Sequence, residues 1–198
     1  DFRDDDSLRV CIIRAAGEKF FCPGWDLKAA AEGDAVDGDY GVGGFGGLQE
    51  LPNLNKPVIA AVNGICCGGG LELALSCDLI LASDNATFAL PEIRSGTVAD
   101  AASIKLPKRI PYHVAMDLLL TGRWFDAEEA LRWGLLKEIT TPAELLPKLF
   151  TPFFKHGEHS GHGLGLAIAK KSILRVNGKL SACNGDARGL IVSIDLAR

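Results

Sequence analysis

Two glutamates, Glu72 and Glu92, stand beside turns that suggest chemistry. Glu72 follows the triple glycine Gly68–Gly70 at the expected start of a helix, and Glu92 follows Pro91. Backbone N–H groups at such a start lack an intrahelical acceptor and can hold an oxyanion formed from a thioester or ester carbonyl. A pair of glutamates nearby can manage one water, one carboxylate taking a proton and the other giving one. Spacing alone favours a helix-capping Glu72 and a solvated Glu92, because exposed carboxylates are the norm.

The elements that must position these carboxylates follow from the apolar runs around them. Near-continuous apolar segments predict buried strands at Leu8–Arg14, Val58–Val62 and Leu79–Ala82. Between the last two lie a glycine-rich loop and a helix-like segment, Leu71–Cys77. The order strand, glycine loop, helix, strand predicts a compact βαβ unit and an α/β fold.

Other segments are typical of turns and helix ends. Phe20–Lys28 is a turn rich in large side chains, and Asp34–Gly47 is a glycine-rich acidic stretch that predicts a mobile loop. Asp126, followed three residues later by Glu129, predicts a capped helix start, and Gly134 its end.

The composition excludes several classes of function. The chain has 198 residues, 23 of them glycine, and a net charge of −4, so it has no field to attract nucleic acid or an anionic membrane. No apolar run is long enough to span a bilayer. None of the six cysteines shows C-x-x-C spacing, which predicts structural thiols in a reducing cytoplasm and no metal site. Because the chain begins without Met, we expect a fragment or a trimmed form.

Three long stretches resemble the enoyl-CoA hydratase (crotonase) superfamily. They are GEKFFCPGWDLKAA (Gly17–Ala30), KPVIAAVNGICCGGGLELALSCDLILASDNATFALPEI (Lys56–Ile93) and LTGRWFDAEEALRWGLL (Leu120–Leu136). The resemblance covers about residues 8–148. The segments FFCPGWDLKAAAEG and FALPEIRSGTVADAASIKLPKRIP look most like the carnitinyl-CoA dehydratases within that superfamily.

The resemblance implies a spiral of ββα units, truncated here at both ends, that binds an acyl-CoA thioester without any cofactor. It places the family's catalytic glutamates on Glu72 and Glu92. It places the two N–H groups of an oxyanion hole on Trp25 and Gly69. Further substrate-binding positions map onto Cys22, Pro23, Gly24, Lys28, Gly68 and Gly70. A side chain at Gly69 is expected to crowd the thioester.

A carnitinyl substrate would need aromatic faces for its trimethylammonium group. Trp25, Tyr40 and Phe45 are candidates, although Tyr40 and Phe45 equally fit a role in anchoring the glycine loop. Lys28 fits either a contact with CoA phosphates or a solvated position.

The last 50 residues have a different character. LFTPFF (Leu149–Phe154), GHGLGLAIAKKSI (Gly161–Ile173), NGKLSA and GLIVSIDL resemble the end of the ATP-binding domain of sensor histidine kinases, with a helix, a strand and a final strand. Flexible glycines before a helix suit phosphate binding. That resemblance places ATP phosphates, with Mg²⁺, near Gly161, Gly163, Leu164 and Gly165. The asparagine-bearing helix and the adenine-binding turn of such kinases are absent from the sequence.

His156, His159 and His162 have the spacing of one helix face, but the glycines around them argue against a helix and a metal site. We therefore expect two units, a partial acyl-CoA domain at 1–148 and a kinase-like ATPase fragment at 149–198.

Three hypotheses follow: a truncated crotonase-type lyase, a nucleotide-binding module, or an inactive fusion of two partial domains. The lyase leads because both glutamates are present. The resemblance implies a trimer-like homo-oligomer, although the family's first strands and its C-terminal helices are missing. Residues Ala99–Ile104 also lack the glycine pair of simple hydratases.

Overall fold

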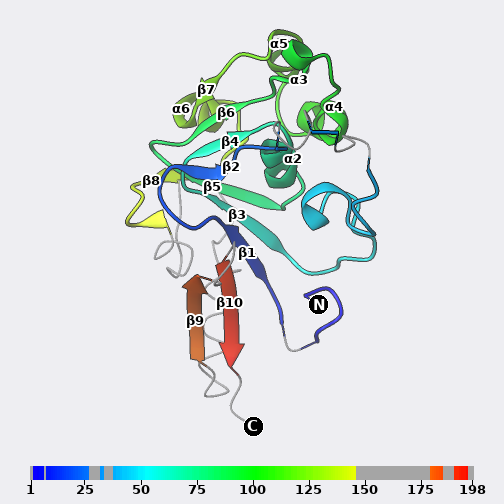
Figure 1. Ribbon diagram of the computed structural model, residues 1–198. Coiled ribbons are helices and arrows are strands. Elements are labelled where there is room, and N and C mark those ends of the chain that lie inside the picture. The colour runs from blue at the N-terminus through cyan, green and yellow to red at the C-terminus, as the bar shows by residue number, and fades with distance from the viewer. Residues whose placement is uncertain are drawn as a thin grey trace.

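From β1 to β6 the chain alternates between two sheets, so that consecutive strands lie in different layers (Figure 1). The computed structural model describes residues 2–6, 8–26, 32–33 and 38–145, together with the backbone of 179–184 and 190–195. The first sheet has the order β1-β3-β5-β8 and is parallel throughout. The second has the order β2-β4-β6-β7, with only β7 antiparallel to its neighbour.

The strands of the first sheet are β1 (Cys11–Arg14), β3 (Val58–Val62), β5 (Leu79–Ser83) and β8 (Glu138–Thr140), and those of the second are β2 (Phe20–Cys22), β4 (Ile65–Cys67), β6 (Thr87–Ala89) and β7 (Phe125–Asp126). The helices are α2 (Gly69–Leu75), α3 (Glu92–Ser95), α4 (Asp100–Lys105), α5 (Tyr112–Thr121) and α6 (Ala127–Arg132), with 3-10 turns η1 (Phe45–Gly47) and η2 (Leu106–Lys108).

The predicted strand Val58–Val62 is confirmed without change as β3, and all five of its residues are buried. The strand expected from Leu8 begins later, at Cys11. The predicted helix lies at Gly69–Leu75 rather than Leu71–Cys77, because the helix starts inside the triple glycine.

The predicted βαβ unit needs one correction. The expected glycine loop contains a further strand, β4, which pairs with β2 and β6 in the second sheet. Its three residues, Ile65–Cys67, lie between glycines and are too few for a clear period-two pattern. The unit is therefore β3-β4-α2, which is the ββα repeat that the family resemblance implied.

The core fills the space between the sheets and the helices. Strand β3 and helix α2 contribute fully buried side chains such as Val62 and Leu71. Phe88 of β6 stacks on Phe125 of β7 with ring centroids 5.3 Å apart. The sheets thus form a rigid base for the turns that follow β4 and β6, where Glu72 and Glu92 stand.

Helix α6 begins as its sequence predicts. The Asp126 side chain accepts a 2.8 Å hydrogen bond from the N–H of Glu129, and Gly134, just past the end of the helix, has φ +78°. In the segment Asp34–Gly47, residues 38–47 are described and contain the 3-10 turn η1 where only a loop was expected.

Near the C-terminus, β9 (Lys179–Asn184) pairs antiparallel with β10 (Leu190–Asp195). This pair confirms the two strands expected at the end of the chain, and it lies beside β1 (Figure 1). The expected helix after Gly165 lies outside the described residues. Among the described residues, no helix is long and apolar enough to span a bilayer.

Candidate active site

Glu72 lies in the first turn of α2, and its side chain is held from the neighbouring helix. Its Oε1 accepts a 2.9 Å hydrogen bond from the backbone N–H of Ala102 in α4. Only 8% of the residue is exposed. Burial raises the pKa of the Glu72 carboxyl, and the charge of Asp100 adds to this, while the Ala102 N–H acts in the opposite direction.

Glu92 approaches the same point from α3. A β-carbon placed on Gly68 would lie 3.0 Å from Glu92 Oε1, so this carboxylate sits against the residue immediately before α2. Burial raises the pKa of Glu92, and the charge of Glu72 contributes to the rise. Its Oε2 is buried without a hydrogen-bond partner among the described residues. Both carboxylates therefore lie beside the start of α2, where the charge of one acts on the other.

The predicted oxyanion-hole residues come from two loops that touch. A β-carbon on Gly24 would lie 2.8 Å from the carbonyl oxygen of Cys67 and 3.4 Å from the nitrogen of Gly69. A β-carbon on Gly70 would clash with the carbonyl of Cys22. The turn carrying Gly24 thus packs directly on the triple glycine. Because Gly69 is the first residue of α2, its N–H has no acceptor within the helix.

Of the remaining residues predicted to bind substrate or nucleotide, the structure describes some and leaves others out. Cys22 ends strand β2, where the sequence predicted a turn from Phe20 onward. Pro23 then leads into Gly24, and Trp25, which is half-buried, follows it. Lys28 lies outside the described residues, as do the predicted nucleotide-binding residues Gly161, Gly163, Leu164 and Gly165 and the histidines His156, His159 and His162.

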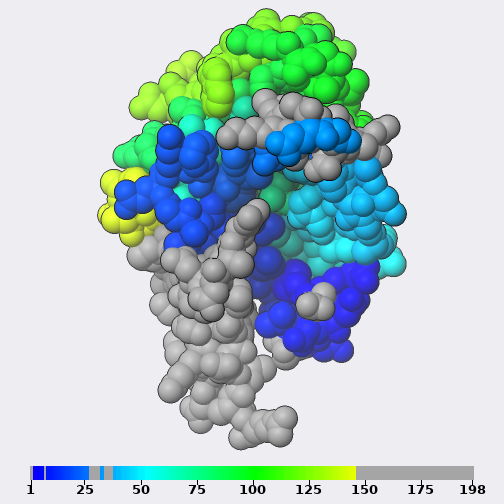
Figure 2. Space-filling view, in the orientation of Figure 1, coloured from blue at the N-terminus to red at the C-terminus, as the bar shows by residue number. Residues whose placement is uncertain are grey.

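An aromatic pair covers the glycine side of the site. The ring of Phe45 occupies the space that a β-carbon on Gly69 would need. Tyr40 meets Phe45 edge to face, with centroids 5.4 Å apart and planes at 84°. Gly69 is thus required here by Phe45, in addition to the thioester crowding expected from sequence. In Figure 2 the light-blue to cyan surface of the segment around η1 lies below the green surface of α3 to α5.

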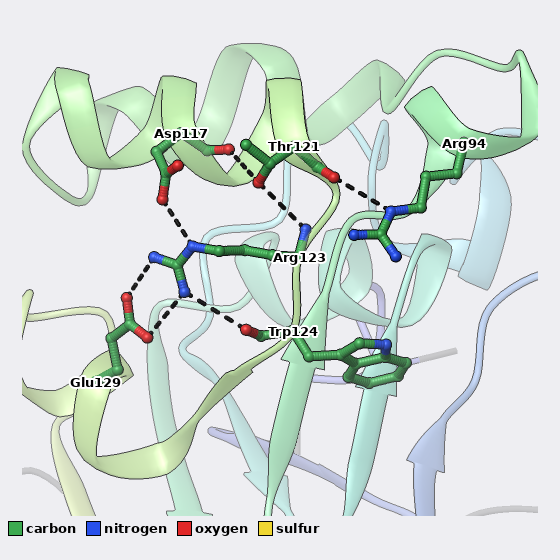
Figure 3. Close-up of polar contacts among 6 residues, drawn as sticks. All are labelled: Arg94, Asp117, Thr121, Arg123, Trp124 and Glu129. Atoms are coloured by element: carbon green, nitrogen blue, oxygen red, sulfur yellow. Dashed lines mark hydrogen bonds and ion pairs between the residues drawn. The ribbon is translucent and has the colours of Figure 1, made fainter.

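A polar clamp holds the segment behind Glu92 (Figure 3). Arg94 of α3 donates from Nε to the carbonyl oxygen of Thr121 at 3.2 Å. Arg123, two residues after Thr121, donates from Nε to Asp117 at 2.7 Å and from Nη2 to Glu129 at 2.6 Å. Between them, Gly122 packs so that a β-carbon would lie 3.2 Å from Pro91 Cα. The clamp therefore joins α5 and α6 to the start of the helix that carries Glu92.

The site depends on two residues that sequence reasoning missed, Ala102 and Gln49. Ala102 acts through its backbone N–H, which a side-chain motif search cannot detect. The sequence holds only an indirect signal for this contact. Asp100 starts a helix, and the N–H groups in the first turn of a helix are free to bind other acceptors. Gln49 lies just past the predicted loop Asp34–Gly47, where the sequence pointed to no functional residue, and its amide acts on Glu72 to lower the pKa of that carboxyl.

The thiols near the site behave as buried apolar groups. The five described cysteines are free, and burial raises the pKa of Cys67 to about 11 and of Cys77 to about 12. Within the described ranges, no cluster of three or more His, Cys, Asp or Glu side chains could hold a metal ion.

A sequence model of the enoyl-CoA hydratase/isomerase family matches residues 1–154 of the 198. The chain belongs to the enoyl-CoA hydratase/isomerase family. A second sequence model, described as histidine kinase-, DNA gyrase B- and HSP90-like ATPase, matches residues 138–198 and overlaps the first.

Two curated relatives of the chain carry the same name. The chain is 51% identical over 186 residues to a carnitinyl-CoA dehydratase of Proteus mirabilis, covering 93% of this chain and 70% of the relative. It is 59% identical over 146 residues to a carnitinyl-CoA dehydratase of Salmonella arizonae, covering 73% of this chain and 56% of that relative. The chain thus spans a little over half to about 70% of the length of these curated relatives.

Solved structures agree with the fold. A carnitinyl-CoA dehydratase from Mycobacterium avium superposes with a TM-score of 0.69 at 36% identity, covering 88% of this chain and 62% of that one. EchA1_1 from Mycobacterium paratuberculosis gives 0.68 at 40% identity, covering 73% and 56%. The crotonase-type α/β fold predicted from sequence is therefore confirmed for the main part of the chain.

Proposed function

We propose that this protein is a crotonase-type lyase that reversibly hydrates an α,β-unsaturated acyl-CoA thioester. The observation that carries the proposal is the meeting of Glu72 and Glu92 at the start of α2, beside the packed turns of Gly24 and Gly69. The family needs no cofactor for this chemistry, since a polarised thioester and two carboxylates supply it.

In the proposed mechanism the N–H groups of Trp25 and Gly69 bind the thioester oxygen. Polarising this carbonyl makes the β-carbon electrophilic and the α-carbon acidic, and fixed donors act before the charge develops. A water between Glu72 and Glu92 adds its oxygen to the β-carbon while one carboxylate takes its proton. The other carboxyl gives a proton to the α-carbon, and dehydration runs through the same steps in reverse.

For one glutamate to act as the base and the other as the acid, the pair must hold one proton between them. Burial raises both pKa values, and each carboxylate disfavours ionisation of the other. The Ala102 N–H stabilises the charged form of Glu72. At Glu92, no N–H of another described residue does the same. We infer that Glu72 is the member that ionises first.

The proposed acyl group is crotonobetainyl in one direction and carnitinyl in the other. Both curated relatives described above are named carnitinyl-CoA dehydratase. The Tyr40–Phe45 pair next to Gly69 offers aromatic faces for a trimethylammonium group. For Lys28 we propose contact with the CoA phosphates. We further propose a cytoplasmic homo-oligomer of trimer type.

The test follows hydration of crotonyl-CoA and crotonobetainyl-CoA by the full chain, compared with Glu72→Gln and Glu92→Gln. Each variant removes a proton-transferring group and is expected to lower kcat by about 10²–10⁴-fold. Glu128→Gln, an exposed change on α6, is the control and should leave the rate unchanged. Equal residual rates in the native chain and both variants would refute the mechanism.

A second candidate function, nucleotide binding by the C-terminal part, is favoured only by the ATPase-family match to residues 138–198. We propose that the chain divides into an acyl-CoA unit at 1–148 and an ATPase-like fragment at 149–198 that is incomplete. Titration of the chain with ATP and Mg²⁺ is expected to give no binding. Saturable, Mg²⁺-dependent binding would instead support the nucleotide function.

A further inference from the structure

The segment that follows η1 is fastened to both helices of the site. The carbonyl oxygen of Gln49 accepts a 2.9 Å hydrogen bond from Lys105 Nζ of α4. The same Nζ donates to Ser76 Oγ at 2.6 Å, and Ser76 Oγ donates to the carbonyl oxygen of Glu72 at 2.8 Å. The main chain of Gln49 is therefore fixed relative to the helix that carries Glu72.

The side chain of Gln49 carries an unused donor. Its Nε2 is buried and has no hydrogen-bond partner among the described residues. Burying an amide N–H without an acceptor is costly, and such groups normally find one. Because this unpaired donor lies in a fixed segment beside the candidate site, we expect it to bind an acceptor of the site when the enzyme is active.

An anionic acceptor close to this donor is the carboxylate of Glu72. The Gln49 amide faces it closely enough to favour its charged form, although the two make no well-aligned hydrogen bond in this structure. Ala102 already supplies one N–H to Glu72 Oε1. A hydrogen bond from the Gln49 amide would add a second donor to the carboxylate, from the segment after η1 rather than from α4.

We propose that Gln49 is a positioning residue for Glu72, whose side-chain amide acts with the Ala102 N–H to fix the orientation of this carboxylate and hold it ionised. Two donors from different elements leave the carboxylate one orientation, which is what a proton transfer at a defined atom requires. The inference rests on the proposed role of Glu72 in catalysis.

Several charged groups also act on Glu72. Asp100 of α4 and Glu92 of α3 are both carboxylates that disfavour its ionisation, and Lys105 of α4 favours it. Among the described side chains that act on the charge of Glu72, Gln49 is the neutral one, so it can be changed without altering the charges around the site.

The experiment measures the ionisation of Glu72 directly in the full chain, with and without the amide. Side-chain ¹³C-labelled glutamate is followed by NMR during a pH titration, and the Glu72 signal is assigned by its loss in Glu72→Gln. Gln49→Met keeps the length of the side chain and removes its donors, and Gln49→Ala is a second variant should the first fail to fold. Either is expected to raise the pH at which Glu72 titrates by about one unit, because a hydrogen bond to a charged group is lost.

The control is Glu128→Gln, an exposed change on α6, which should leave the Glu72 titration where it is in the native chain. An unchanged titration in Gln49→Met or Gln49→Ala overturns the inference. Where hydration is measurable, the acid limb of kcat/KM should shift upward in the Gln49 variants by the same amount. If the native chain hydrates no acyl-CoA, the proposed function fails while the NMR titration still decides the role of Gln49.

Discussion

The backbone N–H of Ala102 donates a 2.9 Å hydrogen bond to Oε1 of Glu72, a residue 30 positions earlier in the chain. This bond ties helix α4 to the first turn of α2 and engages one oxygen of a carboxylate that burial otherwise disfavours. Residues Ala99–Ile104, the segment that lacks the glycine pair of simple hydratases, contain no glycine at all. The contact needs none, because it uses the main chain, which an alanine supplies as well as a glycine does.

The buried carboxylate lowers the stability of the folded chain at neutral pH, so Glu72→Gln should be more stable than the native protein. The folded pKa of Glu72 lies above its ordinary value of 4.5, so the folded state holds the proton more tightly than the unfolded state. Its stability is greatest below about 4.5 and falls as the pH rises through the folded pKa. The amide keeps the acceptor for the Ala102 N–H and carries no charge.

Thermal unfolding across pH checks this prediction. The midpoint of Glu72→Gln should exceed the native midpoint at neutral pH, and the two should converge near and below pH 4.5. The exposed Glu128→Gln should match the native protein throughout. A native chain that is more stable than Glu72→Gln at neutral pH would contradict the assignment of burial as the main cause of the pKa shift.

Gly24→Ala should abolish most of the activity through the oxyanion hole. Gly24 has φ +96°, and an added β-carbon would lie 2.8 Å from the carbonyl oxygen of Cys67. The turn must then move away from Gly69, which separates the two proposed donors. Losing one such donor lowers kcat by about 10²–10³-fold.

Gly17→Ala is the matched control for this change. Gly17 also has a positive φ, +78°, but a β-carbon there meets nothing within 4 Å. Both variants carry the backbone cost of a left-handed alanine, about 1–2 kcal/mol, whereas only Gly24→Ala disturbs the site. Comparable kcat values in the two variants would show that the turn does not hold a donor.

Sequence reasoning predicted the parts of the fold that have a strong local signal. The apolar run Val58–Val62 and the cap at Asp126 were predicted correctly, because one is a fully buried strand and the other a side-chain acceptor at a helix start. Strand β4 was missed because a three-residue strand between glycines has no period to detect. Its existence is decided by pairing with β2 and β6, which are distant in sequence.

The candidate site shows the same division. Glu72 and Glu92 were singled out because each stands next to an unusual turn, and the family resemblance then predicted a catalytic role for them. The groups that set the properties of Glu72 were not singled out, since a backbone N–H from Ala102 and an amide from Gln49 reach it only through tertiary packing. Phe45 was considered as a ligand for a cation or as a loop anchor, and its contact with Gly69 is compatible with both.

Gly122→Ala should impair catalysis through the position of Glu92. Gly122 ends α5 with φ +59°, and an added β-carbon would lie 3.2 Å from Pro91 Cα and 3.0 Å from Ile93 Cγ2. Relief of these contacts shifts the start of α3, and a displacement of about 1 Å at a catalytic group can cost about 10²-fold in rate. Steady-state kcat is the measurement. Gly134→Ala, with φ +78° and open space around it, should lose similar stability and keep its kcat.

Phe45→Leu should distinguish substrates by charge. If the Tyr40–Phe45 pair faces the trimethylammonium group, losing the ring raises KM for crotonobetainyl-CoA by about 3- to 30-fold, the range for a cation–π contact. Leucine still fills the space beside Gly69, so KM for the uncharged crotonyl-CoA should change little. An equal rise for both substrates would assign Phe45 to anchoring the loop.

Arg123→Met should weaken the clamp between α5 and α6 in a pH-dependent way. Arg123 bonds both Asp117 and Glu129, and its guanidinium lowers the pKa of Glu129 below the ordinary 4.5. A carboxyl with a lowered folded pKa contributes stability above its unfolded value, and this contribution is lost as the pH falls through the folded one. For a partly exposed network of this kind we expect a loss of about 1 kcal/mol, or a few degrees in Tm, at neutral pH.

Thermal unfolding of Arg123→Met at several pH values and salt concentrations measures this effect. The deficit should shrink when the pH falls below 4.5 and when salt screens the pairs. Arg3→Met is the control, because Arg3 pairs only with its exposed neighbour Asp4 and with the carbonyl of Pro52 among the described contacts, and it should leave Tm unchanged. A deficit that is independent of both pH and salt would mean that Arg123 stabilises this region by packing its aliphatic stem rather than by its charge.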